Sequence, residues 1–358
     1  MNDFKDIKSL SLDELKTWLK SVGEKPFRAE QIQNWLFSNQ VQSVEEMVNI
    51  SPSLQAKLKE AYQIHTFKEK SRDESVDGTI KWLFQTHDNH FIETVMIPKN
   101  KRFSVCVSTQ IGCAMKCTFC RTAKMGFIRN LEAGEILEEI IRVNWYLKEA
   151  KILNNEGNQA EVTNIIFMGM GEPLNNLENV HRTCCTLHNQ KLFNMGRKRM
   201  TISTSGIVPK IKELVDRNTP CCLAVSLNST SNEQRSAVMP VNRTWPIEVL
   251  LEATDEYTRR TDNPVTFEFV LIKGLTCTKE AAKELIRICA PRRCKVNAIA
   301  LNDGDDPHLQ APSTEEIDRF LEIVRAADVQ ITMRNPRGRD ILAACGQLAY
   351  KQGTVESC

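Results

Sequence analysis

Residues 103–120 read FSVCVSTQIGCAMKCTFC, a short alternating strand that runs into a cysteine-rich loop. After this stretch, short β-branched segments alternate with amphipathic segments of helical period. We expect strands at 103–108, 163–168, 199–203, 221–227, 265–271, 295–300 and 329–333. We expect helices near 133–150, 176–189, 208–217, 246–260, 279–289 and 314–327. Such alternation requires parallel strands, so it predicts an α/β fold, either a doubly wound sheet or a full or partial barrel.

The sequence before residue 103 has a different pattern. Residues 1 to about 65 predict short amphipathic helices, and an alternating pattern between about 79 and 97 predicts a β-hairpin. The basic run 98–102, PKNKR, is interpreted as a linker. We therefore expect three parts: an accessory helical domain with the hairpin (1–98), the βα core (99–348) and a tail (349–358).

Composition excludes several classes of protein. The chain has 358 residues, 41% hydrophobic and 26% charged, with a net charge of +2, which argues against a disordered or fibrous protein. It contains no apolar run of about 18 residues and no apolar N-terminal signal, so we expect a cytoplasmic protein without a membrane contact. Thirteen cysteines are an odd number, which favours reduced or metal-bound thiols over a disulfide framework.

Unusual polar segments follow successive predicted strands. The cysteine loop 113–120 follows the first, Gly-Met-Gly-Glu-Pro (169–173) the second, Ser-Thr-Ser-Gly (203–206) the third, and 226–228 ends the fourth. Asn302 follows the sixth. The carboxyl ends of parallel strands meet on one face, which is where α/β enzymes hold their active sites. These segments are therefore predicted to form one site.

The loop cysteines, Cys113, Cys117 and Cys120, have the spacing C-x3-C-x2-C. Three thiolates without an adjacent fourth suit a [4Fe–4S] cluster that keeps one iron open for a small chelating molecule. The alternative is a structural zinc with Cys106 as the fourth ligand. Structural zinc usually has paired C-x2-C knuckles, and the sequence has no second knuckle.

These motifs resemble those of the radical S-adenosylmethionine (SAM) superfamily, within it the RlmN/Cfr family of RNA methyltransferases. The resemblance covers about residues 10–350 and includes Cys106 seven residues before the loop, GMGEP at 169–173, AACGQL at 343–348 and PFRAEQ at 26–31. It implies a partial (β/α)6 TIM-like barrel with a small N-terminal helical domain. It also implies a [4Fe–4S] cluster and two SAM molecules per turnover.

The implied reaction is methylation of adenine C2 in 23S rRNA and in the tRNA adenosine 3′ to the anticodon. By resemblance, Cys345 carries the methyl group, which a 5′-deoxyadenosyl radical from the second SAM then activates. Cys106 matches the cysteine that releases the RNA through a transient disulfide with Cys345, and Glu93 matches the proton acceptor. Without the resemblance, each of these residues has an ordinary structural interpretation: a helix-packing cysteine, a core cysteine and a solvated strand residue.

The resemblance also implies a set of SAM contacts, in which neutral polar side chains at strand ends bind the ribose, carboxylate and adenine. Asn228 departs from the family, in which histidine is frequent at this position. Ser203 and Ser226 could instead be ordinary helix N-caps. The implied contacts are Gly171, Glu172, Ser203, Ser226, Leu227, Asn228 and Asn302.

RNA contact is expected from local positive charge, because the net charge is small. Further expected partners are 23S rRNA, tRNA and a flavodoxin-type electron donor, and the chain is expected to act as a monomer. The candidate phosphate contacts are Lys99, Lys101, Arg102, Arg121, Lys124, Arg129, Arg334, Arg337 and Arg339.

Three other functions stay open at this point. A Cfr-like enzyme would methylate C8 of the same rRNA adenosine, although Pro173 stands where that group usually has alanine. A non-catalytic RNA-binding protein would use the cysteines for a structural metal. Another radical SAM enzyme would act on a peptide or a small molecule and would carry no methyl on Cys345.

Overall fold

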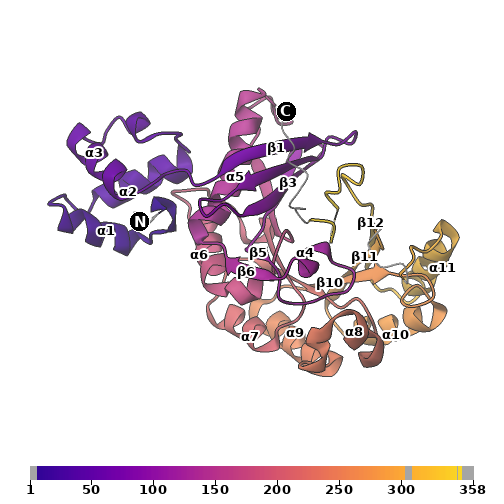
Figure 1. Ribbon diagram of the computed structural model, residues 1–358. Coiled ribbons are helices and arrows are strands. Elements are labelled where there is room, and N and C mark those ends of the chain that lie inside the picture. Colours follow the sequence, from indigo (N-terminus) through magenta and orange to yellow (C-terminus); the bar gives the residue numbers. More distant parts are fainter. Residues whose placement is uncertain (1–5, 303–308, 345, 349–358) are drawn as a thin grey trace.

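The computed structural model describes residues 6–302, 309–344 and 346–348 (Figure 1). Cys345 and the expected tail 349–358 lie outside the described residues. The main feature is a ten-stranded sheet with the order β1-β2-β3-β4-β7-β8-β9-β10-β11-β12. From β4 onward, all neighbouring strands pair in parallel. The parallel strands are β4 (Arg102–Cys106), β7 (Val162–Phe167), β8 (Met200–Thr204), β9 (Cys222–Ser226), β10 (Val265–Leu271), β11 (Cys294–Ala300) and β12 (Ile331–Arg334).

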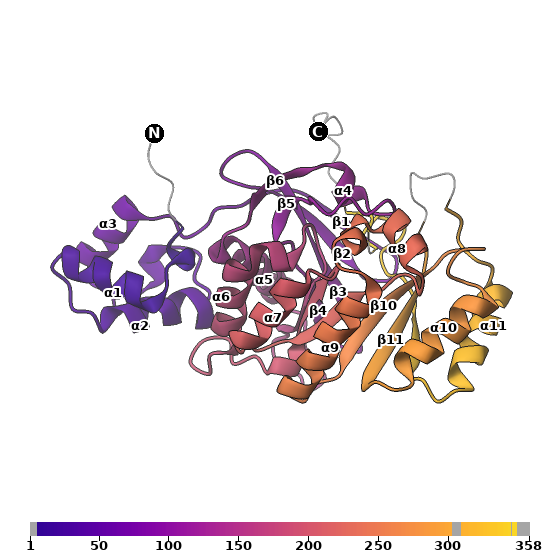
Figure 2. The same ribbon diagram turned by 90° about the horizontal axis from the view of Figure 1, so that it is seen from below.

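Helices connect these strands and cover the outer side of the sheet (Figure 2). They are α5 (Ala133–Glu149), α6 (Leu177–His188), α7 (Val208–Asp216), α9 (Ile247–Thr261), α10 (Lys279–Cys289) and α11 (Thr314–Arg325). The predicted α/β fold is confirmed, as a partial TIM-like barrel whose edge strands β1 and β12 do not pair. The seventh parallel strand, β12, confirms the strand predicted at 329–333, although the resemblance alone implied six.

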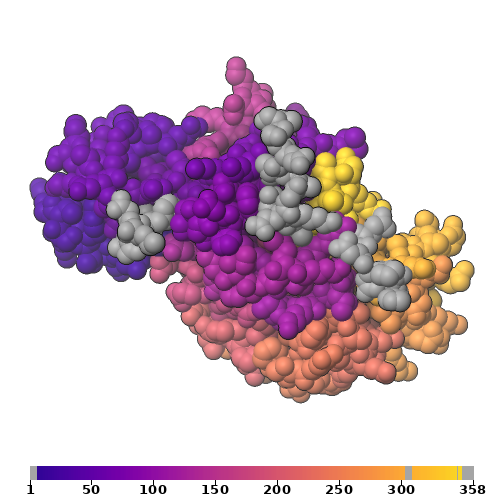
Figure 3. Space-filling view, in the orientation of Figure 1, coloured from indigo at the N-terminus to yellow at the C-terminus, as the bar shows by residue number. Residues whose placement is uncertain are grey.

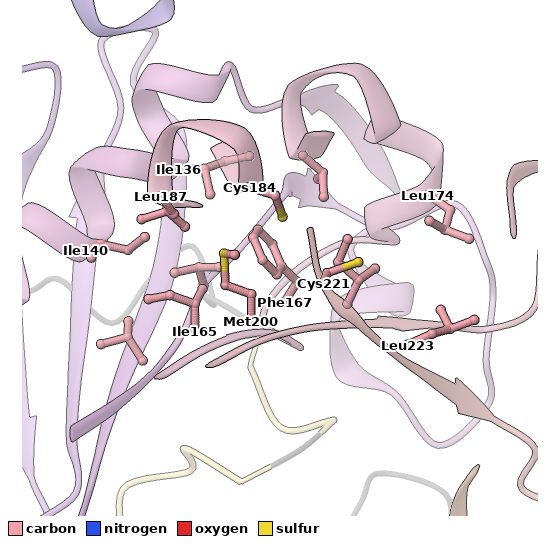
Figure 4. Close-up of a cluster of buried hydrophobic side chains, with 14 of the residues drawn as sticks. Ile136, Ile140, Ile165, Phe167, Leu174, Cys184, Leu187, Met200, Cys221 and Leu223 are labelled. Atoms are coloured by element: carbon pink, nitrogen blue, oxygen red, sulfur yellow. The ribbon is translucent and has the colours of Figure 1, made fainter. Parts of the chain in front are cut away.

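The buried contact between helices and sheet shows why this alternation folds (Figure 4). Ile165 and Phe167 of β7 are fully buried against Ile136 of α5 and Leu187 of α6. Cys184 lies in the same apolar cluster, where burial raises the pKa of its thiol. Such cysteines act as small apolar side chains, and no disulfide joins any cysteine in the described ranges.

The N-terminal helices α1 (Leu12–Ser21), α2 (Arg28–Gln33) and α3 (Pro52–Ala61) form a separate lobe at one end of the molecule (Figures 1 and 3). A buried ion pair fastens the start of this lobe to α5. Lys8 Nζ lies 2.9 Å from Asp6 Oδ1 and 3.2 Å from Glu138 Oε2. Glu138 also accepts hydrogen bonds from the backbone N–H groups of Thr66 and Phe67.

The predicted hairpin is present as β2 (Ile80–Gln85) and β3 (Phe91–Lys99), but its surroundings differ from expectation. The linker interpretation of 98–102 is wrong: β3 pairs antiparallel with β4, and a tight turn at Asn100 and Lys101, both at positive φ, joins them. The sheet therefore continues through the expected boundary between 98 and 99. A further strand, β1 (Lys68–Glu74), pairs with β2; its wholly exposed side chains have no apolar pattern to reveal it.

Four short elements, β5, β6, α4 and α8, lie around the cysteine loop. Strands β5 (Gln110–Gly112) and β6 (Phe127–Asn130) form a separate antiparallel pair, and α4 (Arg121–Lys124) lies between them in sequence. Helix α8 (Asn232–Val238) follows β9. None of these elements was expected from the sequence. Among the described residues, no helix has the length and apolarity needed to span a membrane.

Candidate active site

The predicted polar segments meet in one cavity of about 190 Å³ at the carboxyl ends of the parallel strands. Its wall combines the cysteine loop after β4 with the residues that follow β7, β8, β9 and β11. The structure thus places these predicted segments around one cavity. The expected site residues that line this cavity are Cys113, Cys117, Cys120, Gly171, Glu172, Ser203, Ser226, Asn228 and Asn302.

Backbone hydrogen bonds fix the cysteine loop at several points. Cys113 N donates to Gly126 O at 2.8 Å, which closes the loop at its base. Thr118 N donates to Val238 O at 3.0 Å, which ties the loop to the end of α8. Burial raises the pKa of the Cys113 thiol to about 12, and burial with neighbouring thiols raises that of Cys117 further. A bound cation would be needed to hold these sulfurs as thiolates.

The sulfurs of Cys113, Cys117 and Cys120 line one cavity, where an iron–sulfur cluster could be held. Within the described residues, no three His, Cys, Asp or Glu side chains converge closely enough to hold one metal ion. An iron–sulfur cluster binds each cysteine through a different iron, so its thiolates need not converge. Cys106 lines the neighbouring cavity and not this one. The residues therefore fit a [4Fe–4S] cluster with one iron lacking a protein thiolate.

Gly171 and Glu172 occupy a tight crossing between two loops. Gly171 has φ +103°, and a Cβ there would lie 2.6 Å from Gln110 Cβ, so only glycine fits. Glu172 Oε2 accepts from Ser205 N and Ser205 Oγ, both at 2.8 Å, while Oε1 accepts from Leu174 N at 3.1 Å. The Glu172 carboxylate thus connects the loops after β7 and β8 and lines the cavity at the same time.

The segment that ends β9 has a specific backbone shape. Asn228 adopts the left-handed conformation, at φ 53°, and its Oδ1 accepts from Val270 N at 3.1 Å. Leu227 does not line the cavity: its side chain is fully buried, and its N–H donates to Glu268 O. Asn302 Oδ1 accepts a hydrogen bond from Arg339 Nε at 3.3 Å. Asn302 lines both this cavity and a second one.

Arg235 of α8 supports this wall and was missed by sequence reasoning. Its fully buried guanidinium donates to the carbonyl oxygens of Ser205 (2.7 Å), Ser226 (2.9 Å) and Leu227 (2.9 Å). Burial lowers its pKa to about 10, so it is charged at neutral pH. One side chain thus holds the loops after β8 and β9 together. The sequence carries no signal for this, because α8 itself was not expected.

Glu268 is a second missed residue. It lies inside the apolar strand β10 and lines the cavity. Its Oε1 accepts from Asn297 Nδ2 at 2.9 Å, and its Oε2 has no hydrogen-bond partner among the residues that the structure describes. Burial raises the pKa of the Glu268 carboxyl, an effect partly offset by Arg334. A lone carboxylate within an apolar strand was a signal that could have identified it.

A second cavity, of about 600 Å³, lies beside the first, and the two share Met168, Ile299 and Asn302 in their walls. Cys106 lines it, together with Ala343, Ala344 and Leu348. Its wall is basic: it includes the expected contacts Lys99, Arg334 and Arg337, and also Arg199, which the sequence did not single out.

The residues that flank Cys345 lie along both cavities. Ala343 and Ala344 line the second cavity with Cys106, whereas Gly346 and Gln347 line the first with the loop cysteines. Gly346 O accepts from Arg121 N at 2.8 Å. Thr122 Oγ1 donates to Leu348 O at 2.5 Å. This C-terminal stretch is thus bonded directly to the helix that follows Cys120.

Glu93 lies on β3 and is buried, with 5% of its surface exposed. It lines neither of these two cavities. Its Oε1 lies 3.3 Å from Lys81 Nζ of the neighbouring strand β2. Glu93 is therefore not the solvated strand residue that its sequence context alone would suggest.

One expected RNA contact has a different environment. Arg129 forms ion pairs with Asp88 (2.6 Å) and Glu135 (2.7 Å). Both ion pairs hold the β5–β6 pair against the rest of the core. The Arg129 guanidinium, with the Thr86 hydroxyl, outweighs burial and holds the pKa of Asp88 below its usual range. Because two carboxylates already neutralise Arg129, its charge is not available for phosphate in the way expected.

Comparison with known proteins agrees with this geometry. Residues 5–64 match the model of the ribosomal RNA large subunit methyltransferase N-terminal domain, and residues 107–286 match the radical SAM superfamily. The chain is 40% identical to the dual-specificity RNA methyltransferase RlmN of Anaeromyxobacter sp. (strain Fw109-5), covering 97% of this chain and 91% of that protein. It is 39% identical to a probable RlmN of Bacillus licheniformis, covering 98% and 95%.

A solved structure is similar over nearly the whole fold. The radical SAM methyltransferase from Sphaerobacter thermophilus superposes with a TM-score of 0.90 and 38% sequence identity. The superposition covers 96% of this chain and 98% of that one. The likeness therefore extends over both the N-terminal lobe and the barrel.

Proposed function

The chain belongs to the RlmN family of dual-specificity RNA methyltransferases, within the radical SAM superfamily, and we propose that it methylates C2 of adenosine in 23S rRNA and in tRNA. The proposed sites are an adenosine of the peptidyl-transferase region and the tRNA adenosine 3′ to the anticodon. Carbon 2 of adenine lies between two ring nitrogens and is electron-poor. It cannot attack a sulfonium methyl group directly, so a radical route is required.

Cys113, Cys117 and Cys120 would hold a [4Fe–4S] cluster in the first cavity. When bound, the cluster and SAM supply a 5′-deoxyadenosyl radical. Gly171 with Glu172 is proposed to bind the methionyl end of SAM, and Ser203, Ser226, Leu227, Asn228 and Asn302 to bind the rest. Leu227 does not line the cavity, and its N–H and carbonyl oxygen are both bonded within the protein, so its role would be to hold Ser226 and Asn228 in place.

Three residues would act on the methyl group and the base. Cys345 accepts a methyl group from one SAM, carries it as a thioether and, after hydrogen abstraction, bonds through it to C2. The adduct formed at C2 would return one electron to the oxidised cluster, and Glu93 accepts the proton lost from C2. The Cys106 thiolate then attacks the Cys345 sulfur, and the bond between that sulfur and the methylene carbon breaks. The carbon takes up a proton to become the methyl group of the released RNA, and the two cysteines are left as a disulfide that a reductant must reopen. Two SAM molecules are consumed in each turnover.

The observation that supports this assignment most strongly is the position of the residues around Cys345. The pair before it lines the cavity of Cys106, and the pair after it lines the cavity of the three loop cysteines. A methyl carrier must serve both sites in turn, because it is activated beside the cluster and resolved beside Cys106. The basic second cavity supplies a matching place for a phosphate-bearing substrate.

The remaining partners follow from this chemistry. A flavodoxin-type protein is proposed as the electron donor, and the chain is proposed to act as a monomer on cytoplasmic RNA. The electron donor can be tested by whether it supports methylation by the reconstituted enzyme, and the monomer by the mass of that enzyme in solution.

The test is anaerobic reconstitution with methyl-labelled SAM and both RNAs, followed by mass spectrometry of the digested RNA and of the Cys345 peptide. We expect label on Cys345 and 2-methyladenosine in the RNA. An 8-methyladenosine product would instead identify a Cfr-like enzyme, and RNA binding without any methylation would identify a non-catalytic protein.

A further inference from the structure

The C-terminal stretch before Cys345 is docked on the turn between β1 and β2. Asp340 Oδ1 accepts from Ser75 Oγ at 2.6 Å, and its Oδ2 accepts from Val76 N at 3.2 Å. Gly338 N donates to Asp77 Oδ2 at 3.2 Å. The fit at Gly338 is close, since a Cβ there would lie 2.9 Å from Thr79 Cγ2. The turn thus holds this stretch through both side-chain and backbone groups.

Lys81, on β2 just after this turn, joins the docked stretch to Glu93. Its Nζ donates to Ile341 O at 2.6 Å and lies 3.3 Å from Glu93 Oε1. Only 11% of the Lys81 side chain is exposed, so water screens these contacts little. Ile341 precedes Cys345 by four residues. One ammonium group therefore contacts both the segment that leads to Cys345 and the carboxylate of Glu93.

We propose that Lys81 is a positioning residue that couples docking of the methyl-carrier segment to the placement of Glu93 for removal of the C2 proton. This inference rests on the proposed function, which supplies the roles of Cys345 and Glu93. The proton passes from C2 to the Glu93 carboxylate, and Lys81 takes no part in the transfer. The Ile341 carbonyl orients the ammonium, and the ammonium orients the carboxylate.

The other charged groups near Lys81 interact with it more weakly than Glu93 does. Asp73 of β1 is the other carboxylate beside its Nζ, at 3.8 Å, but that side chain is 52% exposed and thus only weakly coupled. Arg337 lies 3.7 Å from Asp77, in the turn between β1 and β2.

The experiment compares wild-type protein with Lys81→Met and Lys81→Arg, all reconstituted with their cluster. Lys70→Met is the matched control, because Lys70 lies exposed on the neighbouring strand β1. Ser75→Ala weakens the dock from the other side and serves as the second variant if Lys81→Met folds poorly. Three quantities are measured: methyl loading of Cys345, the rate of RNA methylation, and the isotope effect for RNA deuterated at adenosine C2. Tryptic cleavage at Arg337 and Arg339 reports docking without any turnover.

We expect Lys81→Met to load Cys345 normally but to methylate RNA on the order of 10–100-fold more slowly, because a misplaced base costs about that much. The C2 isotope effect should rise above the wild-type value, Lys81→Arg should recover much of the rate, and Lys70→Met should match wild type. Cleavage at Arg337 and Arg339 should be faster in Lys81→Met and Ser75→Ala.

Two results would overturn the inference: a wild-type methylation rate in Lys81→Met, or a lower rate with an unchanged isotope effect and no recovery in Lys81→Arg. The proposed function fails in a different way, since wild-type protein itself would then carry no methyl on Cys345. In that case the role of Lys81 in catalysis is also refuted. The cleavage assay would still show whether the stretch before Cys345 binds the turn between β1 and β2.

Discussion

Replacing Arg235 tests how the wall of the first cavity is held. Arg235→Met removes the donors to the carbonyl oxygens of Ser205, Ser226 and Leu227 and to the amide oxygen of Asn242. The Leu227 oxygen keeps Ser229 N as a donor at 2.7 Å, so the cost comes from the other three oxygens. Each unsatisfied buried carbonyl costs about 1–3 kcal/mol, and neighbouring losses are not additive. We therefore expect the free energy of unfolding to fall by about 3–5 kcal/mol.

The same change should weaken ligand binding, because the three carbonyls belong to the loops that form the cavity. The assay is urea unfolding together with calorimetric titration of S-adenosylhomocysteine into the reconstituted protein. Arg287→Met is the control; Arg287 is exposed on α10, and its pairing with Glu284 is a surface pair, so its loss should cost under about 1 kcal/mol. We expect the affinity of Arg235→Met to fall by about tenfold or more, equivalent to about 1.4 kcal/mol. A stability loss as small as that of the control, with unchanged affinity, would refute the account.

Three further predictions concern the carrier, the resolving cysteine and pH. Cys345→Ala should abolish RNA methylation while leaving iron content and reductive cleavage of SAM intact, as measured by 5′-deoxyadenosine release. Cys106→Ala should accumulate protein covalently bound to RNA, visible as a slow band in denaturing gels; product release at the wild-type rate would exclude the resolving role. Burial lowers the pKa of His65 from 6.5 to about 4, so the unfolded chain binds the proton first as pH falls, and stability is lost below about 6.5. The stability of wild type relative to His65→Phe should therefore decrease by about 2–3 kcal/mol between pH 7.5 and 4.5, measured from urea unfolding; a difference independent of pH would contradict the assignment.

The sequence was most informative where local pattern and tertiary structure agree. The strands at 163–168 and 265–271 and the helices at 133–150 and 279–289 lie within a residue or two of β7, β10, α5 and α10. Each combines a clear apolar period with an end signal, such as Thr278, whose side chain accepts from Ala281 N at the start of α10. The motifs after each strand converge because parallel strands place their carboxyl ends on one face.

The remaining features depend on long-range pairing, which one sequence does not reveal. Strand β1 is held by its pairing with β2 and has no buried face of its own. The run 98–102 is basic like a linker, yet it forms a turn within the sheet because β3 and β4 are neighbours. Arg129 has the composition of a phosphate contact, but Asp88, 41 residues earlier, pairs with it. Glu93 and Lys81 each look like ordinary strand residues until β2 and β3 bring them together.

The central claim is that Cys113, Cys117 and Cys120 hold an iron–sulfur cluster whose open iron binds SAM. It is tested most directly by iron and sulfide analysis of anaerobically prepared protein, with spectra of the reduced cluster recorded before and after addition of SAM. We expect about four iron atoms per chain, a spectral change on adding SAM, and loss of both in the Cys117→Ala variant. Protein that contains no iron and cannot be loaded with it, or a Cys117→Ala variant that retains the same cluster and the same response, would contradict the account.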